Sequence, residues 1–240
     1  MPTIGSVKKK KIGIIQFPGS NCDTDCYRSL DRHFNAAPVY VWHKEHTLPP
    51  LDGVILPGGF SYGDYLRSGA LASWSPIVNA VKEYAKKGGP VLGICNGFQV
   101  LTESRMLPGA LLKNSNGQFV CDNHIYLKTD AGGDSAYHNG LSKKVLRVPI
   151  AHGDGRYHID GEGLKKLKGQ GQILFRYSDS KGVIGGESNP NGAVDDVAGV
   201  ISENGKVLGM MPHPERATDV FLGGSSDGLG ILEIFLNLSQ

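Results

Sequence analysis

A cysteine lies between two glycines where a short apolar run gives way to a helical pattern, and this junction constrains the fold more than any other stretch. The run is Val91 to Ile94, and Cys95 follows it, flanked by Gly93 and Gly97. Strand, sharp turn and helix in that order make a nucleophile elbow, whose known form Gly-x-Ser-x-Gly needs glycine because the turn is tight. The competing interpretation is a buried cysteine at a strand end, with glycines that permit close packing.

An elbow would serve a cysteine nucleophile in three ways. It places the side chain at the carboxyl edge of the sheet, where open α/β sheets bind ligands. It sets the sulfur of Cys95 at a helix N-terminus, whose partial positive charge favours a thiolate. It also directs the backbone N–H of Asn96 toward the place where a substrate oxyanion would form.

The rest of the first half alternates between strand and helix patterns. Short apolar runs predict strands at Lys11 to Phe17, Val39 to Trp42 and Leu51 to Leu56. Helices are expected through Tyr27, Leu30 and Phe34, capped by Ser20 or Asn21, and from Ser75 to Lys87. Such alternation predicts βαβ units, and therefore a doubly wound α/β fold with a mostly parallel sheet.

The second half differs, because its apolar runs are separated by turn signals that predict extra β hairpins. These runs are Phe119 to Leu127, Val145 to Ile150, Ile173 to Tyr177, Val197 to Ile201 and Val207 to Met210. Turns are expected at Asn189 to Gly192 and at Glu203 to Gly205, the second within a hairpin. Leu229 to Leu238 predicts a closing helix. Residues 1–10 are expected to be a disordered leader, and 11–240 a single domain.

Composition narrows the class of protein. The 240 residues carry a net charge of +2, which gives no electrostatic case for binding nucleic acid or an anionic membrane. No apolar stretch is long enough to span a bilayer, and we expect a cytoplasmic protein. Its four cysteines do not form a disulfide framework for a chain of this length.

Two further segments would complete a thiol site. His213 follows an apolar run, lies between two prolines and precedes Glu215 by two residues, so in an extended segment both side chains would project to one side. Glu215 would then orient the imidazole toward Cys95. Gly58 and Gly59 end another apolar run, and a backbone N–H there would supply a second oxyanion donor. The alternative for His213 is a surface histidine beside a solvated glutamate.

These pieces, in this order, resemble the class I (triad-type) glutamine amidotransferases. The closer resemblance is to the glutaminase subunit of phosphoribosylformylglycinamidine synthase, of the separate-subunit kind. It rests on blocks spread from Phe17 to Arg216: FPGSNCD, PGGFSYGDYLRSGALA, GICNGFQVL, IAHGDGRYH, NPNG and GMMPHPER. Asp154 departs from it, since glutamate is expected there, which puts in doubt a detailed contact but not the triad.

The resemblance implies a mechanism and a division of labour. Cys95, His213 and Glu215 would be catalytic, Gly58, Gly59 and Asn96 would form the oxyanion hole, and Gln99, Asn114 and Phe119 would contact glutamine. Ammonia would pass to an ATP-dependent synthetase subunit that makes the amidine of formylglycinamide ribonucleotide in purine synthesis. A small accessory subunit would join the complex. This chain would need no cofactor, since ATP and Mg²⁺ would act in the partner.

Several other residues admit an alternative interpretation. His152, Asp154 and His158 match no metal-site spacing, and Cys22 and Cys26 lack a second ligand pair, so no metal is expected. Cys121 is expected in the core. Phe60, Tyr62, Tyr65 and Arg67 would be either core or a partner surface.

Two other functions compete with a glutaminase subunit. One is a stand-alone cysteine hydrolase or peptidase on the same elbow, which need not combine Gln99 with the His213–Glu215 pair. The other is a catalytically silent binding module, which the intact Cys95 and His213 weaken.

Overall fold

The computed structural model describes residues 8–238. Nine strands form one sheet, in which the first five of the order below run parallel to one another and the last four pair antiparallel. In spatial order they are β2 (Ala36–Trp42), β1 (Lys10–Gln16), β3 (Gly53–Leu56), β4 (Val91–Ile94), β13 (Val207–Met210), β12 (Val197–Ile201), β11 (Ile173–Ser178), β7 (Tyr126–Thr129) and β8 (Val145–Arg147).

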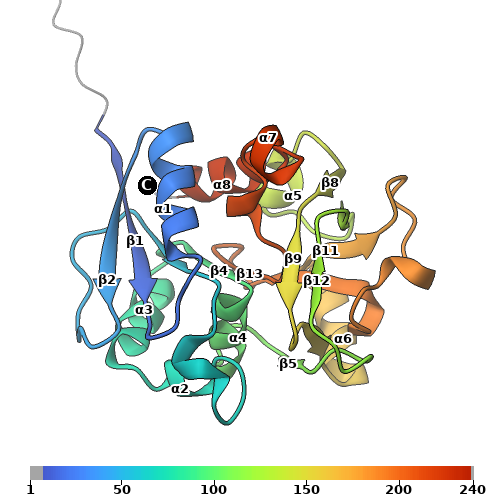
Figure 1. Cartoon of the computed structure of the whole chain (residues 1–240), viewed down its shortest axis with the longest axis horizontal. Coiled ribbons are helices and arrows are strands. Elements are labelled where there is room, and N and C mark those ends of the chain that lie inside the picture. The colour runs from blue at the N-terminus through green and yellow to red at the C-terminus, as the bar shows by residue number, and fades with distance from the viewer. Residues whose placement is uncertain (1–7, 239–240) are drawn as a thin grey trace, which may run out of the picture.

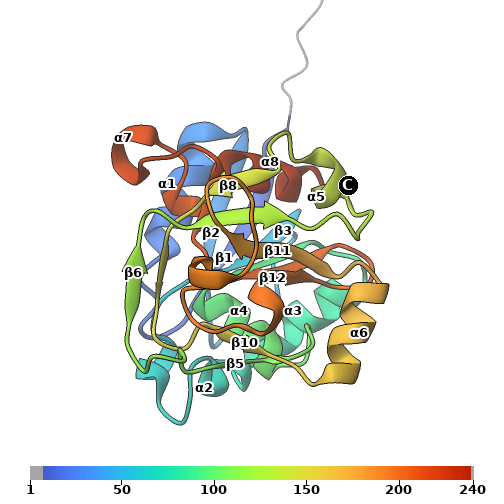
Figure 2. The same cartoon turned by 90° about the vertical axis from the view of Figure 1, so that its right-hand side faces the viewer.

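Helices cover both faces of this sheet. Figures 1 and 2 show one group on one side and a second group on the other. The first comprises α1 (Asp23–His33), α5 (Ala136–Gly140), α7 (Val220–Gly223) and α8 (Gly228–Asn237). The second comprises α2 (Ala70–Ser73), α3 (Pro76–Lys86), α4 (Asn96–Glu103) and α6 (Gly161–Gly169). The predicted doubly wound α/β fold is therefore confirmed.

The central strands are short because both of their faces are buried. Every residue of β3, β4 and β13 is buried, as expected for parallel strands covered on both sides. The antiparallel strands β12 and β13 form the hairpin predicted at Glu203 to Gly205, with Ile201 opposite Leu208. Helices α3 and α8 confirm the two later helix predictions to within a residue at each end.

Two small ribbons lie beside the main sheet and replace longer predicted strands. β5 (Ala110–Leu112) pairs with β10 (Arg156–His158), and β6 (Val120–Asp122) pairs with β9 (Ile150–His152). The predicted strand from Phe119 to Leu127 is wrong as one element, because the Asp122 side chain accepts from the N–H of His124 and turns the chain between β6 and β7. Val145 to Ile150 likewise divides between β8 and β9.

Three local predictions need correction. Cys121 is exposed rather than in the core, because its strand belongs to a two-stranded ribbon. Cys22, not Ser20 or Asn21, is the N-cap of α1, and its side chain makes no capping hydrogen bond. Lys10 belongs to β1, so the proposed leader is shorter by at least that residue, and residues 1–7 lie outside the described part. No helix within 8–238 is long and apolar enough to cross a membrane.

Candidate active site

Cys95 lies at the turn between β4 and α4 in a conformation that side chains rarely adopt. Its φ is 50° and its ψ is −105°, a strained region that persists only where the surroundings fix it. The backbone N–H of Cys95 donates to the carbonyl of Met210 at 2.8 Å, which ties the turn to β13. A side chain at Gly97 would put its Cβ 1.9 Å from the carbonyl oxygen of Leu56. The structure therefore has the elbow geometry that the glycines predict.

The thiol of Cys95 is almost fully buried and faces the strand β9. Its side chain is part of a residue only 5% exposed, and Sγ donates to the carbonyl of Ala151 at 3.6 Å. β9 therefore passes directly over the elbow and limits access to the sulfur.

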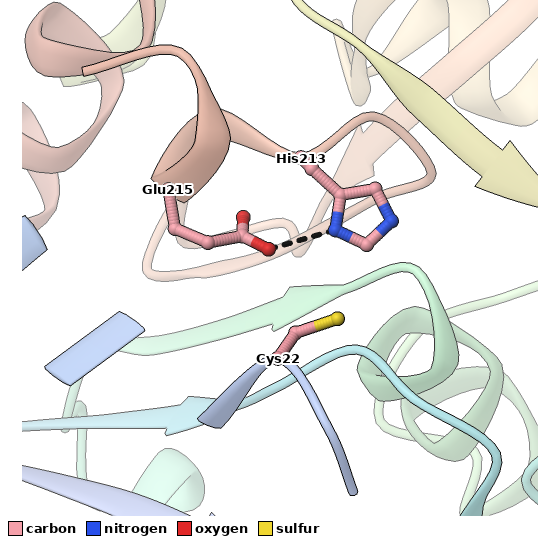
Figure 3. A group of neighbouring side chains, drawn as sticks. All are labelled: Cys22, His213 and Glu215. Atoms are coloured by element: carbon pink, nitrogen blue, oxygen red, sulfur yellow. Dashed lines mark hydrogen bonds and ion pairs between the residues drawn. The ribbon is translucent and has the colours of Figure 1, made fainter. Parts of the chain in front are cut away.

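His213 and Glu215 form a buried hydrogen-bonded pair (Figure 3). Nδ1 of His213 donates to Oε1 of Glu215 at 2.7 Å, and the two side chains are 1% and 0% exposed. The prediction of an extended segment is wrong, since Glu215 lies in a short 3-10 turn, Pro214–Arg216, that brings its carboxylate back to the ring. The N–H of His213 donates to the carbonyl of Pro149 at 2.8 Å, which fixes the backbone.

The charge environment makes His213 a stronger base than a free imidazole. Burial alone would lower the pKa of His213, but the Glu215 carboxylate and then the Cys95 thiol outweigh it and raise that pKa well above its usual value. Nε2 of His213 has no hydrogen-bond partner among the described residues and is buried. Because Glu215 holds Nδ1, Nε2 is the ring nitrogen left to exchange a proton with a thiol.

The two glycines after β3 lie against this pair. A Cβ on Gly58 would be 2.8 Å from Cε1 of His213, so the loop contacts the ring. Backbone hydrogen bonds clamp the loop from the β1–α1 connection: Cys22 N–H donates to the Gly58 carbonyl at 3.2 Å, and Phe60 N–H to the Gly19 carbonyl at 3.0 Å. Asn96 occupies the first turn of α4, where backbone N–H groups lack helical acceptors.

The Asn96 side chain connects these elements. Its Oδ1 accepts from the N–H of Ser61 at 3.2 Å, and its Nδ2 donates to Oε1 of Gln99 at 2.8 Å. The structure therefore brings Cys95, His213, Glu215, Gly58, Gly59 and Asn96 together, as the sequence predicts.

The three residues predicted to contact glutamine lie in different settings. Nε2 of Gln99 donates to the carbonyl of Asp154 at 2.7 Å. The side-chain amide of Asn114 forms its hydrogen bonds within the protein: Nδ2 donates to the His152 carbonyl at 2.9 Å, and Oδ1 accepts from the Gly155 N–H at 3.0 Å. Phe119 is 54% exposed. Gln99 and Asn114 therefore hold the 152–155 loop beside Cys95, and their contact with glutamine stays a prediction.

The histidines of that loop do not form a metal cluster with Asp154. His152 is buried, and neither of its ring nitrogens has a hydrogen-bond partner among residues 8–238. Burial, and secondly the field of His213, lower the pKa of His152 to about 4. The Asp154 carboxylate instead accepts from Ser68 at 2.7 Å, and His158 is exposed.

Cys22 is the residue near this site that sequence reasoning did not place. It is 2% exposed, and its sulfur accepts from Nη2 of Arg216 at 3.1 Å. A Cβ on Gly58 would lie 3.0 Å from this sulfur. The only signal for it was that FPGSNCD and GMMPHPER, the blocks holding Cys22 and Arg216, both belong to the resemblance.

A cavity of about 280 Å³ reaches the histidine–glutamate pair from the side of α1 and α7. Its walls include His213, Glu215 and Arg216, and on its other side Ile150 and Ala151 of β9. Cys95 is not part of its lining. The cavity therefore lies beside the pair and does not reach the nucleophile, while the two side chains themselves stay closed to solvent.

Comparison with known proteins shows similarity to glutamine amidotransferases. Residues 9–223 match the CobB/CobQ-like glutamine amidotransferase domain. The phosphoribosylformylglycinamidine synthase subunit PurQ of Prochlorococcus marinus (strain MIT 9312) is 48% identical over 223 residues, covering 92% of this chain and 96% of that protein. A chain in the structure of PurLQS from Thermotoga maritima has a TM-score of 0.81 and 38% identity, covering 97% of this chain and 100% of that one. A glutamine amidotransferase from Thermotoga maritima shares the fold, with a TM-score of 0.55 and 19% identity over 96% of this chain and 88% of that one.

Proposed function

Because this chain belongs to the CobB/CobQ-like glutamine amidotransferases, and among them to the PurQ subunits of phosphoribosylformylglycinamidine synthase, we propose that it is the glutaminase subunit of that synthase. It hydrolyses L-glutamine to glutamate and ammonia, and the ammonia is used by an ATP-dependent synthetase subunit. That partner converts formylglycinamide ribonucleotide to its amidine in de novo purine synthesis. The observation that carries the proposal is the buried His213–Glu215 pair beside Cys95 on a strained elbow.

The chemistry begins at the sulfur. His213 accepts the thiol proton through Nε2, and Cys95 attacks the side-chain amide carbon of glutamine. The N–H groups of Gly59 and Asn96 stabilise the oxyanion of the tetrahedral intermediate. His213 then gives its proton to the departing nitrogen, which leaves as ammonia, and a glutamyl thioester remains on Cys95.

Hydrolysis of the thioester reverses the proton path. Nε2 of His213 takes a proton from water, which attacks the thioester carbonyl, and the thiol is restored as glutamate leaves. Glu215 holds Nδ1 at 2.7 Å throughout, so that the ring keeps its orientation and its positive form is stabilised.

The partner and setting follow from the same proposal. ATP and Mg²⁺ act in the synthetase subunit, a small accessory subunit completes the complex in the cytoplasm, and this chain needs no cofactor. Exposed aromatic side chains beside the oxyanion loop support a protein partner there, since Tyr and Phe are enriched at interfaces. Phe60 is 47% exposed and Tyr65 75% exposed. Tyr62 is partly buried, and its hydroxyl is hydrogen-bonded to Nδ1 of His43 and to Oγ of Ser75.

The first test separates ammonia production from ammonia use. In the reconstituted complex, Cys95→Ser is expected to abolish glutamine-dependent amidination and to leave ammonia-dependent amidination intact, because the nucleophile only generates ammonia. Cys121→Ser, which changes an exposed thiol, is the matched control. Loss of both activities in an assembled Cys95→Ser complex would contradict the division of labour.

A labelling experiment tests the substrate class. The purified chain is treated with a glutamine-mimicking electrophile, and the adduct is mapped by mass spectrometry with free glutamine as competitor. A single adduct on Cys95 that glutamine suppresses is expected. An adduct elsewhere, or none even with the synthetase present, would favour a silent binding module, and an adduct that glutamine leaves unchanged would favour an unrelated cysteine hydrolase.

A further inference from the structure

Three side chains of different metal-binding types meet behind the histidine ring. Cys22 from the start of α1 faces His213 and Glu215 from the segment after β13 (Figure 3). One ligand atom from each lies within 4.8 Å of the other two, and all three residues are buried. Among residues 8–238 no other group of histidine, cysteine and carboxylate side chains is so closely placed. Thiolate, imidazole and carboxylate are together a donor set suited to zinc.

The cluster has unused donor capacity. Oε2 of Glu215 and Nε2 of His213 are buried and have no hydrogen-bond partner among the described residues. A buried polar atom without a partner is costly, so such atoms usually serve a ligand, a water or a reaction. The reaction accounts for Nε2, since that nitrogen serves Cys95, but it leaves Oε2 of Glu215 unexplained.

A cavity lies beside the cluster. The cavity of about 280 Å³ is lined by both His213 and Glu215 and opens between α1 and α7. Two more carboxylates, Asp25 and Asp219, line its walls together with Arg28, Arg32 and Arg216, so the cavity carries charges of both signs. Cys22 is not among the lining residues and both other side chains are closed to solvent, so a wall residue such as Arg216 has to move before an ion passes from the cavity to the cluster.

We propose that Cys22, His213 and Glu215 form a site for a zinc-type divalent ion, and that an ion bound there switches the glutaminase off. The ion takes the position of the Nδ1 proton, the Glu215 carboxylate holds it with the otherwise unpartnered Oε2 available as an oxygen ligand, and the sulfur of Cys22 completes the set. Ligand atoms on one zinc ion lie roughly 3.3 to 3.7 Å apart, given metal–ligand distances of about 2.0 to 2.3 Å. The set therefore needs only a shift of about an ångström to close around an ion.

The proton balance explains the inhibition. In the resting pair Nδ1 carries the ring proton, because it donates to the carboxylate. When the ion binds Nδ1, this proton moves to Nε2, and the thiol of Cys22 releases its own proton to solvent. Nε2 is then a donor and cannot accept the proton of Cys95. Ion binding itself does not depend on the proposed function, whereas the loss of glutaminase activity does.

Arg216 has to adjust in this proposal. Its Nη2 donates to the sulfur of Cys22, and its Nε donates to Asp25 at 3.1 Å. The side chain is 36% exposed at the cavity, so it can keep the Asp25 contact while the sulfur turns to the ion. Its positive charge weakens binding of a cation, which Glu215 and the Cys22 thiolate offset.

The test is a titration of the purified, chelator-treated chain with Zn²⁺, and with Co²⁺ as an optical probe. We expect one ion per chain, a thiolate-to-cobalt charge-transfer band, and loss of glutaminase activity in parallel with occupancy. Cys22→Ser is expected to weaken zinc binding by more than about 100-fold, since even outer-sphere partners of a metal contribute 10- to 100-fold. Each variant's activity is compared with its own metal-free rate.

Matched variants separate the competing sites. Cys26→Ser removes a buried thiol of the same helix, and Cys121→Ser removes an exposed thiol of the same cavity; both are expected to bind zinc as the wild type does. If Cys22→Ser does not fold, wild-type protein alkylated at Cys95 must still show the cobalt band. Zinc binding that persists in Cys22→Ser, a band lost on alkylation of Cys95, or no stoichiometric binding would each overturn the proposal. Binding without inhibition would overturn only the switch.

Discussion

Replacing Gly97 by alanine adds one methyl group at the point where α4 crosses the end of β3. The new Cβ would lie 1.9 Å from the carbonyl oxygen of Leu56 and 2.9 Å from the Cβ of that residue. Real Cβ contacts do not fall below about 3 Å, so the two backbones have to separate by more than about an ångström. Neither partner is a flexible side-chain end, and the strain therefore moves the first turn of α4 itself.

This movement carries the nucleophile with it, because Cys95 caps the same helix. A misplacement of about 1 Å at a reacting group costs on the order of 100-fold in rate, which corresponds to about 2.7 kcal/mol of transition-state stabilisation. Overpacking a close contact also lowers the free energy of unfolding by about 1 to 3 kcal/mol. We expect both losses in Gly97→Ala.

Two assays and one matched variant check this reasoning. The rate of covalent labelling of Cys95 by a glutamine-mimicking electrophile reports the nucleophile, and thermal unfolding reports the packing. Gly169→Ala makes the same change in helix α6, where a Cβ would meet nothing within 4 Å. Its free energy of unfolding is expected to rise by about 0.5 to 1 kcal/mol. A Gly97→Ala protein that labels at the wild-type rate and melts at the wild-type temperature would refute the steric account of the elbow.

Two further predictions concern groups around the elbow. Glu215→Ala is expected to retain a glutaminase rate roughly 10- to 100-fold higher than that of His213→Ala, because an orienting group contributes less than the base. Equal rates for the two variants in steady-state kinetics, or a lower rate for Glu215→Ala, would contradict these roles. Burial, and secondly Asp154, raise the pKa of Asp64 to about 6. A carboxyl whose pKa is raised on folding gives stability below about pH 4 that is lost as the pH rises through 6. The melting temperature of Asp64→Asn minus that of the wild type should therefore increase between pH 4 and pH 7. A difference that stays constant over this range would rule out the burial effect.

The elements that sequence reasoning located correctly are those whose local chemistry admits one solution. β4 and α4 were predictable because a buried strand with three apolar side chains, a glycine-flanked cysteine and a helical pattern agree with one another. The segment from Phe119 to Leu127 was predicted as one strand although Asp122, Asn123 and His124 interrupt its apolar residues, and the N–H of His124 donates to Asp122 to make the turn there. The bend that returns Glu215 to His213 was missed because a proline-initiated 3-10 turn and an extended segment have the same local sequence signals.

The composition of the site itself depends on strand order, which local patterns do not encode. β1, β3, β4 and β13 are neighbours in the sheet and parallel, so their carboxyl ends meet at one edge. The segments that follow these four strands supply Cys22, Gly58, Cys95 and His213 in turn. The sequence order places β13 last, after the antiparallel strands, and gives no sign that it returns to lie beside β4. Cys22 therefore could be recognised as a neighbour of His213 only from the structure, although both residues follow apolar runs that sequence analysis had identified as strands.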